Sequence, residues 1–301
     1  MKKIYLDIGS NHNQDFTRAK LLIEEAADIR DKCGYIAGIK FQLFHPDRLY
    51  APGTKYSPDF EKLKLSQLPL EWIPYLADKA EEHELEMGLT VFDMGSLVDF
   101  DDLRDQYKIK VYMKISSSDL LRHDIIESSA LLANCMGTRL HISTGGATSQ
   151  EICAAIKVAS GITIDFPIVY HCAMNYPCAP EDAKLSRIHT LADIIYGIGK
   201  FESYLQAYDY VGYSDHTALA PVVTKAFSWI KTCELHFDLD DKCGRETSIG
   251  HCWTSAMLRE LCKSLTIAEV SGHDDFRCID LDLRADPIDG LRPRMKHRED
   301  I

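Results

Sequence analysis

The stretch Tyr208-Asp209-Tyr210-Val211-Gly212-Tyr213-Ser214-Asp215-His216-Thr217 passes from an apolar, strand-like run into a polar segment. The same order recurs about twenty residues later, where the run Trp229–Glu234 leads to His236. Each run has the length of a buried strand, and the amphipathic segment Thr217–Ser228 lies between them. A strand, a helix and a second strand in this order are typical of a parallel sheet covered by helices.

The same alternation extends over most of the chain. We expect amphipathic helices at Arg18–Arg30, Leu70–His83, Leu120–Leu132, Gln150–Ala159 and Thr217–Ser228. We expect strands at Lys3–Ile8, Ile36–Phe41, Glu86–Val91, Val111–Ile115, Arg139–Ser143, Pro167–His171, Tyr208–Gly212 and Trp229–Glu234. Eight such units predict a (β/α)8 TIM barrel over residues 1–265, with a short C-terminal tail, 266–301, packing on the barrel. A doubly wound open sheet is the alternative, but no Gly-x-Gly-x-x-Gly turn follows the first expected strand.

The composition limits the class of protein. The chain has 301 residues, of which 46% are hydrophobic and 27% charged, as in soluble globular proteins. It contains neither an apolar run long enough for a membrane helix nor the apolar core of a signal peptide. Its ten cysteines are scattered, which indicates reduced thiols and a cytoplasmic location. The formal charge of −12 argues against a nucleic-acid or membrane partner.

Polar residues follow every expected strand. In a TIM barrel the active site lies at the carboxyl ends of the strands, so these residues are expected to meet at one face. The pattern favours an active site over a binding scaffold. The candidates from the first seven strands are Asp7, Lys40, Gln42, Thr90, Lys114, Ser117, Ser143, Gly145, Asn175, Tyr176 and Ser214.

Lys40 and Lys114 resemble a clamp for a phosphate or carboxylate. Lysine supplies a point charge, and the hydroxyl groups of Thr90, Ser117 and Ser143 can donate hydrogen bonds to the same anion. The alternative is that each lysine only pairs with a neighbouring protein carboxylate. Two such lysines beside several hydroxyl-bearing turns favour the anion site.

His216 and His236 are candidates for metal ligands. Neutral imidazoles at the ends of neighbouring strands would face one cavity, and two ligands leave coordination positions open for water and substrate. The alternative is that each histidine is a buried structural group, and spacing alone leaves both readings open. A divalent ion beside an anion clamp suits Lewis-acid chemistry on a phosphorylated enol and a carbonyl.

Beyond spacing, an ordered set of motifs resembles one family, the sialic acid synthases. This family includes N-acetylneuraminate synthase and the synthases of legionaminic and pseudaminic acids. The resemblance covers roughly residues 3–255, and its order makes it far more specific than any single motif. The motifs are Asp7-Ile8-Gly9-Ser10-Asn11-His12-Asn13, Lys40-Phe41-Gln42, Thr90-Val91-Phe92-Asp93, Lys114-Ile115-Ser116-Ser117, Ser143-Thr144-Gly145, His171-Cys172 with Tyr176-Pro177, Ser214-Asp215-His216-Thr217 and Glu234-Leu235-His236-Phe237.

The resemblance implies a TIM barrel that condenses phosphoenolpyruvate with the aldehyde of an acylated aminosugar. The products would be a nine-carbon 2-keto acid and phosphate, and the enzyme would be a homodimer that needs Mn²⁺, with Mg²⁺ or Co²⁺ as substitutes. His216 and His236 then resemble the metal ligands, and Asp7, Lys40, Lys114 and Tyr176 the catalytic set. The residues that resemble substrate contacts, most of them around phosphoenolpyruvate, are Gln42, Thr90, Ser117, Ser143, Gly145, Asn175 and Ser214.

The chain departs from the family pattern near the expected sugar site. Asp7 replaces a glutamate, and Met174 stands where the family often has Asn or Ser. Gly244-Arg245-Glu246-Thr247 replaces the family's Gly-Pro-Asp-His, so Glu246 is expected to take the place of the aspartate that contacts the sugar. His251 and Trp253 are expected either to add to this rim or to pack structurally.

The family usually carries a C-terminal antifreeze-like domain that lends an arginine to the partner subunit's sugar site. The present sequence ends at Ile301, and we expect no such domain. We expect Arg284 or Arg292, in the tail, to replace that arginine; the alternative is a tail that only packs across the barrel.

Other functions remain open on the residues alone. A metal-assisted TIM-barrel hydrolase would need more metal ligands, namely further histidines and a carboxylate, and the first expected strand has no His-x-His motif. A lyase that forms a Schiff base through Lys114 would need an unpaired lysine with a lowered pKa. A non-catalytic sugar-binding relative would have no need of both histidines and both lysines.

Overall fold

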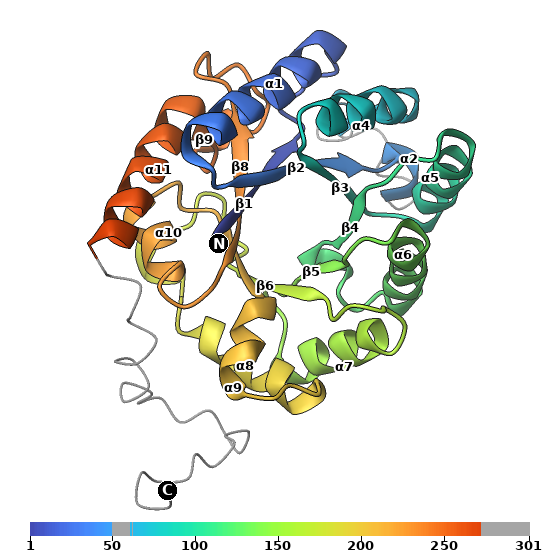
Figure 1. The fold of residues 1–301 in the computed structure, drawn as a ribbon. Coiled ribbons are helices and arrows are strands. Elements are labelled where there is room, and N and C mark those ends of the chain that lie inside the picture. Colours follow the sequence, from blue (N-terminus) through green and yellow to red (C-terminus); the bar gives the residue numbers. More distant parts are fainter. Residues whose placement is uncertain (50–60, 62, 272–301) are drawn as a thin grey trace, which may run out of the picture.

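Eight parallel strands close into a barrel, with β1 paired to both β2 and β8 (Figure 1). The computed structural model describes residues 1–49, 61 and 63–271. Closure of the sheet confirms the (β/α)8 fold and excludes the doubly wound alternative. The barrel strands are β1 (Lys3–Gly9), β2 (Ile36–Leu43), β3 (Glu86–Val91), β4 (Tyr112–Ile115), β5 (His141–Ser143), β6 (Ile168–Cys172), β7 (Val211–Asp215) and β8 (Thr232–Asp238).

Helices surround the barrel and cover its outer face (Figure 1). The α-helices are α1 (Phe16–Cys33), α2 (Pro46–Leu49), α4 (Ile73–Glu82), α5 (Met94–Tyr107), α6 (His123–Met136), α7 (Ser149–Ser160), α8 (Arg187–Ile198), α9 (Tyr204–Ala207), α10 (Ala220–Ala226) and α11 (Ser255–Val270). Short 3-10 turns are η1 (Leu70–Trp72), η2 (Ser117–Asp119), η3 (Pro180–Asp182), η4 (Tyr208–Tyr210) and η5 (Thr247–Ile249), and β9 (Trp253–Thr254) pairs with the end of β8.

Strand register brings the candidate residues together. Asp7 on β1 lies opposite Lys40 on β2 and opposite His236 on β8. Thr90 on β3 lies opposite Lys114 on β4. Because side chains alternate between the two faces of a strand, Glu234 and His236 share the inner face of β8. The strand register alone, without the loops, therefore determines which of these polar groups can touch.

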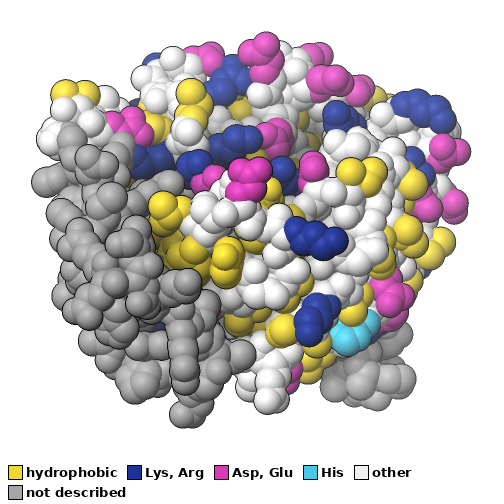
Figure 2. Space-filling model, turned by 60° about the horizontal axis from the view of Figure 1, so that its bottom comes forward, with side chains coloured by type: hydrophobic (Ala, Val, Ile, Leu, Met, Phe, Trp, Pro, Cys, Tyr) yellow, Lys and Arg dark blue, Asp and Glu magenta, His cyan; other side chains and the backbone are white. Residues whose placement is uncertain are grey.

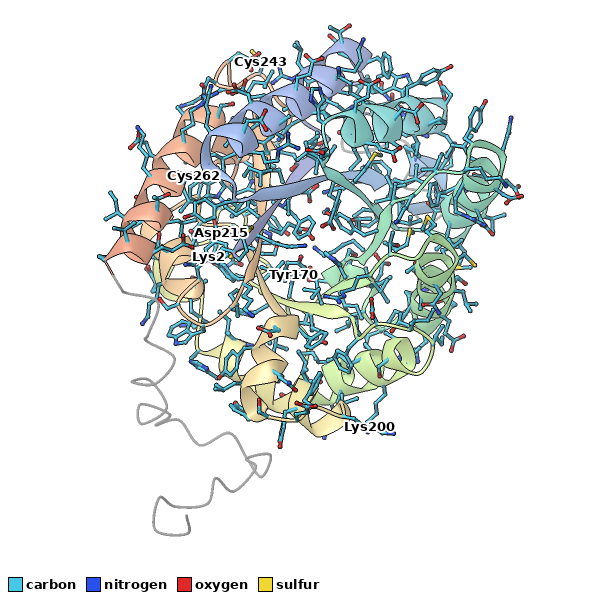
Figure 3. All side chains as sticks on the ribbon, in the orientation of Figure 1. Lys2, Tyr170, Lys200, Asp215, Cys243 and Cys262 are labelled. Carbon is cyan, nitrogen blue, oxygen red and sulfur yellow. The ribbon has the colours of Figure 1, made fainter. Side chains whose placement is uncertain are left out.

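Aromatic side chains fill the barrel interior around β4, β5 and β6. The rings of Tyr112 and His141 stack with their centres 4.4 Å apart, and Tyr170 makes a 3.0 Å hydrogen bond to Nδ1 of His141. All three are buried, and Tyr170 lies inside the barrel in Figure 3. These side chains form a packed core from which Lys114 extends, with its Nζ 4.5 Å from the centre of the Tyr170 ring.

Four expected elements are displaced along the sequence. Helix α6 begins at His123 and not at Leu120, because the backbone N–H of Leu120 bonds to the carbonyl of Ser117 in the turn η2. Tyr208–Tyr210 forms the 3-10 turn η4, so β7 begins at Val211, and β8 begins at Thr232 because Trp229 and Ile230 close the turn after α10. Helix α10 begins at Ala220 and not at Thr217, since the carboxylate of Asp215 accepts hydrogen bonds from the backbone N–H groups of Thr217 and Ala218. His236 therefore lies within β8, whereas His216 follows β7 directly.

Helix α11 runs across the expected boundary at residue 265 and ends at Val270, and the division into a barrel over residues 1–265 and a tail over 266–301 stays a prediction. The expected tail residues Arg284 and Arg292 lie outside the described residues. Within the described part of the chain, no helix is long and apolar enough to cross a membrane. Acidic and basic side chains are interspersed on the face drawn in Figure 2, with hydrophobic side chains between them.

Candidate active site

A cavity of about 390 Å³ opens at the carboxyl ends of the barrel strands. Among the candidates that the structure describes, all except Gly145 and Asn175 line it. The lining candidates are Asp7, Lys40, Gln42, Thr90, Lys114, Ser117, Ser143, Tyr176, Ser214, His216, His236 and Glu246. Six lining residues were not among the candidates, although four of them stand inside the quoted motifs: Phe92, Ser116, Ser118, Cys172, Glu234 and Ile249. Met174 and His251 also line the cavity.

Gly145 and Asn175 lie beside the cavity. The backbone N–H of Gly145 donates a 2.9 Å hydrogen bond to Oγ of Ser117, which links the ends of β4 and β5. A Cβ atom at Gly145 would come within 2.7 Å of the sulfur of Met174, so a glycine lets this turn approach the loop after β6. Asn175 is exposed on that loop. Their assignment as substrate contacts stays a prediction.

Lys40 is held by a buried carboxylate. Its Nζ lies 2.6 Å from Oδ2 of Asp7 and 2.8 Å from Oγ1 of Thr90, and Gln42 donates to the same Asp7 oxygen at 3.2 Å. Burial lowers the pKa of Lys40, but the negative charges of Asp7 and Glu234 outweigh this effect and raise the pKa above its ordinary value. The two carboxylates therefore favour the charged ammonium form of Lys40 inside the cavity.

Lys114 is paired in the same way. Its Nζ lies 2.6 and 2.7 Å from the two carboxylate oxygens of Glu234, and Ser214 donates to Glu234 at 3.2 Å. Burial raises the pKa of Glu234, but the ammonium groups of Lys114 and Lys40 outweigh burial and hold this pKa well below its ordinary value. The expected alternative, pairing of each lysine with a protein carboxylate, is thus present in the structure. Glu234, which pairs with Lys114, was not among the residues predicted for the site.

The two imidazoles lie side by side, with the ring centres of His216 and His236 5.3 Å apart. His216 donates its Nδ1–H to the carbonyl oxygen of Ala173 at 2.5 Å, because a carbonyl can only accept. Nδ1 of His236 lies 2.8 Å from Oε2 of Glu246. Burial, followed by the neighbouring His236, lowers the pKa of His216 to about 3. A neutral imidazole with one nitrogen left over is the form that binds a metal.

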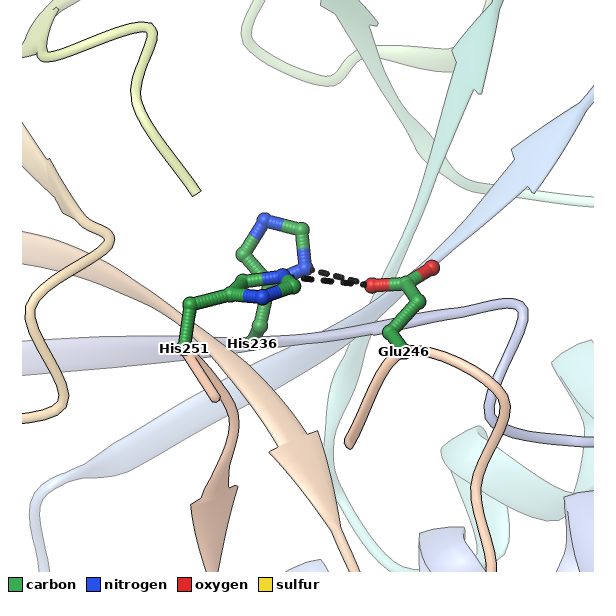
Figure 4. Close-up of side chains that lie close together, drawn as sticks. All are labelled: His236, Glu246 and His251. Carbon is green, nitrogen blue, oxygen red and sulfur yellow. Dashed lines mark hydrogen bonds and ion pairs between the residues drawn. The ribbon is translucent and has the colours of Figure 1, made fainter. Parts of the chain in front are cut away.

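Glu246 and His251 extend this group. One donor atom each from His236, Glu246 and His251 lie within 4.8 Å of one another (Figure 4). Burial raises the pKa of Glu246, but the hydrogen bond from His236 and the nearby imidazole of His251 outweigh burial and keep this pKa well below its ordinary value. Tyr176 stacks on His216 with the ring centres 4.0 Å apart. Nitrogen and carboxylate donors of this kind fit a borderline divalent ion such as Mn²⁺, Co²⁺ or Zn²⁺.

The sequence profile of the NeuB family matches residues 22–274. The chain belongs to the NeuB family.

Relatives of named function are synthases. The N,N'-diacetyllegionaminic acid synthase of Legionella pneumophila is 30% identical over 262 residues, covering 79% of this chain and 64% of that protein. The pseudaminic acid synthase of Helicobacter pylori is 26% identical over 246 residues, covering 79% of this chain and 66% of that protein. The chain therefore spans slightly less than two thirds of the length of these relatives.

A solved structure shares the fold. The N-acetylneuraminic acid (sialic acid) synthetase of Leptospira borgpetersenii serovar Hardjo-bovis, in complex with citrate, superposes with a TM-score of 0.72 at 22% identity. The superposition covers 94% of this chain and 91% of the other. At this identity the likeness supports the barrel alone, whereas membership of the NeuB family rests on the sequence.

Proposed function

We propose that this chain is a nonulosonic acid synthase that condenses phosphoenolpyruvate with an N-acetylmannosamine-like aminosugar in its aldehyde form. The observation that supports this proposal most directly is that one cavity in a NeuB-family barrel is lined by Lys40, Lys114, His216 and His236. C3 of phosphoenolpyruvate bonds to the aldehyde carbon, one water adds at C2, and the C2–oxygen bond to phosphate breaks. The products are a nonulosonic 2-keto acid and inorganic phosphate.

The lysines are suited to hold phosphoenolpyruvate without giving up their carboxylate partners. An ammonium group has three N–H donors. Lys40 uses two of them on Asp7 and Thr90, and Lys114 uses two on Glu234. The third donor of each remains for a phosphate or carboxylate oxygen. Because both ammonium groups are fixed before the substrate arrives, they stabilise the charge that develops at C2 with little reorganisation.

The donor set supports a divalent ion, with Mn²⁺ proposed first and Mg²⁺ or Co²⁺ as substitutes. His216 and His236 would hold it, since each has its Nδ1 engaged by another group and Nε2 left over. The bound ion would polarise the sugar aldehyde as a Lewis acid. Asp7 lies 2.6 Å from Nζ of Lys40 and 3.8 Å from Nε2 of His236, and we assign it to orient the water.

Tyr176, Gln42, Ser117, Ser143 and Ser214 complete the proposed substrate pocket, with Gly145 and Asn175 at its edge. We further propose a homodimer in the cytoplasm whose partners are phosphoenolpyruvate and the sugar, with no role for nucleic acid or membrane. Arg284 or Arg292 would supply the arginine to the sugar site that the family usually draws from its additional domain.

Phosphate release tests the proposal. Purified protein would be incubated with phosphoenolpyruvate and Mn²⁺ across a panel of aldoses that includes N-acetylmannosamine and mannose, with EDTA in a parallel series. We expect release that needs both the ion and one class of aldose. Release without any sugar would indicate a hydrolase, and no release with any aldose would overturn the synthase assignment.

A further inference from the structure

Both carboxylate oxygens of Glu246 are engaged by other parts of the chain. Oε1 accepts hydrogen bonds from the backbone N–H of Ser10 at 2.6 Å and from its hydroxyl at 2.9 Å. Oε2 accepts from Nδ1 of His236 at 2.8 Å. The backbone N–H of Glu246 donates to Oδ1 of Asn11 at 2.8 Å. The side chain, 13% exposed, is therefore fixed at both ends.

The first loop is shaped to receive this carboxylate. Gly9 has a φ of +51°, and a Cβ atom there would lie 2.1 Å from Oε1 of Glu246. A glycine is thus needed both for the backbone conformation and for the close approach. The Glu246 carboxylate is built into the turn after β1 and does not stand free at the rim.

His251 lies beside the same oxygen. Its Nε2 lies 3.6 Å from Oε2 of Glu246, and its ring centre is 4.5 Å from that of His236. Figure 4 shows both imidazoles directed toward one carboxylate oxygen. His251 is buried, and its Nδ1 has no hydrogen-bond partner among the described residues. It supports Glu246 from the side opposite Ser10.

The two candidate metal ligands are held by equivalent bonds. His216 donates Nδ1–H to the Ala173 carbonyl, and His236 donates Nδ1–H to Glu246. In the neutral form of each imidazole this leaves the lone pair on Nε2. A carboxylate that accepts the other N–H of a metal-binding histidine fixes the tautomer and makes the imidazole a stronger ligand.

We infer that Glu246 is a positioning residue that holds His236 in the Nδ1–H tautomer, and that this role replaces direct contact with the sugar. The inference rests on the metal site of the proposed function. Because Oε1 of Glu246 already accepts two hydrogen bonds and Oε2 accepts one, we expect the acceptor sugar to be recognised by other groups in the cavity. This assignment departs from the expectation that Glu246 substitutes for the family's sugar-binding aspartate.

The tautomer can be observed directly. Metal-free protein labelled with ¹⁵N-histidine would be studied by long-range ¹H–¹⁵N correlation spectroscopy, with His236 assigned from the His236→Gln spectrum. We expect the Nδ1–H pattern for His236 in the wild type and loss of that pattern in Glu246→Ala. Glu246→Gln keeps an oxygen that accepts the N–H, so it should restore the pattern. Glu260→Ala, which removes an exposed carboxylate from α11, serves as the control.

Metal affinity provides the second readout, with Co²⁺ as the probe and calorimetry as the measurement. We expect Glu246→Ala to weaken Co²⁺ binding by about 10- to 100-fold, and Glu246→Gln to recover most of it. In active variants the KM for the aldose should stay near the wild-type value. An unchanged His236 tautomer in Glu246→Ala would overturn the inference. So would loss of Co²⁺ binding in both variants, which would make Glu246 a direct ligand, or a raised aldose KM with unchanged Co²⁺ affinity.

These readouts separate the inference from the proposed reaction. The tautomer and the Co²⁺ affinity need no phosphoenolpyruvate. If no aldose supports phosphate release but both readouts follow Glu246, the proposed reaction fails and the positioning role stands. If phosphate is released but neither readout responds to Glu246→Ala, only the positioning role fails.

Discussion

The buried pair Lys114–Glu234 combines two opposite charges inside the barrel, both with side chains under 5% exposed. We expect Lys114→Met to lower the free energy of unfolding by about 3–5 kcal/mol, because Glu234 is left as an uncompensated buried charge. Denaturant unfolding would measure the change. Lys114→Met combined with Glu234→Leu should regain most of the stability, since an apolar pair can replace a buried ion pair. It should remain inactive. A stable single variant would contradict this account of the pair.

The same pair argues against a Schiff base at Lys114. Burial lowers the pKa of Lys114, which a Schiff-base lysine needs, but Glu234 holds the ammonium group with two hydrogen bonds. We therefore expect no covalent adduct when borohydride is added to the protein with an aldose. Intact-protein mass spectrometry would measure this. A peptide containing Lys114 and carrying the reduced sugar would support the lyase alternative instead.

At the scale of elements, Arg18 on α1 connects three parts of the site. It forms ion pairs with Asp238 on β8 and with Asp241, the latter at 2.7 Å. Asp238 in turn accepts hydrogen bonds from the backbone N–H of Gly244 and the hydroxyl of Thr247, which flank Glu246. The guanidinium of Arg18 therefore holds the loop that carries the proposed positioning carboxylate.

We expect Arg18→Met to speed amide exchange over residues 244–247, because Asp238 loses its buried cation and the loop loses its anchor. Hydrogen–deuterium exchange would measure the protection. Arg259→Met is the control, since Arg259 joins α11 to Glu25 and Asp28 on α1 and, among the described residues, reaches the loop through a 3.7 Å ion pair with Asp240, away from residues 244–247. Equal exchange rates in the loop of Arg18→Met and wild type would show that the loop is held by other contacts.

Sequence periodicity predicted the barrel and most strands, because buried parallel strands are short apolar runs separated by amphipathic helices. It failed where local hydrogen bonds compete with the pattern. The aromatic residues Tyr208 and Tyr210 suggested a strand but form a 3-10 turn. Helix α10 begins later in the sequence than expected, because the Asp215 carboxylate accepts a hydrogen bond from the backbone N–H of Ala218. Helix α5 was not expected, since its acidic sequence, Met94–Tyr107, carries only a weak apolar stripe.

The candidate site was predicted only in part, because contacts between side chains depend on the folded structure as well as on local sequence pattern. Strand ends and motif order identified both lysines and both histidines, but pairing is a property of three-dimensional register. Glu234 lies two residues before His236, and this period-two spacing was the available signal that both face the interior. The partner of Glu246 could not be predicted, because it depends on how the loop after β8 folds against the turn after β1.

For the whole molecule, a bound ion should stabilise the fold. When the concentration of free ion is 100 times its Kd for the native state, binding adds about 2.7 kcal/mol to the free energy of unfolding. We expect Mn²⁺ or Co²⁺ to raise the melting temperature of the wild type by several degrees. His216→Ala should abolish the rise, whereas His123→Ala, at an exposed position on α6, should keep it. An equal rise in His216→Ala would place the ion elsewhere.

The central claim, that this NeuB-family barrel joins phosphoenolpyruvate to an aldose, is tested most directly by the mass of the product. The reaction would contain Mn²⁺, phosphoenolpyruvate and the accepted aldose, and its products would be identified by mass spectrometry. We predict one new 2-keto acid whose mass equals aldose plus phosphoenolpyruvate plus water, less phosphoric acid. Pyruvate and phosphate beside unchanged aldose would contradict the account.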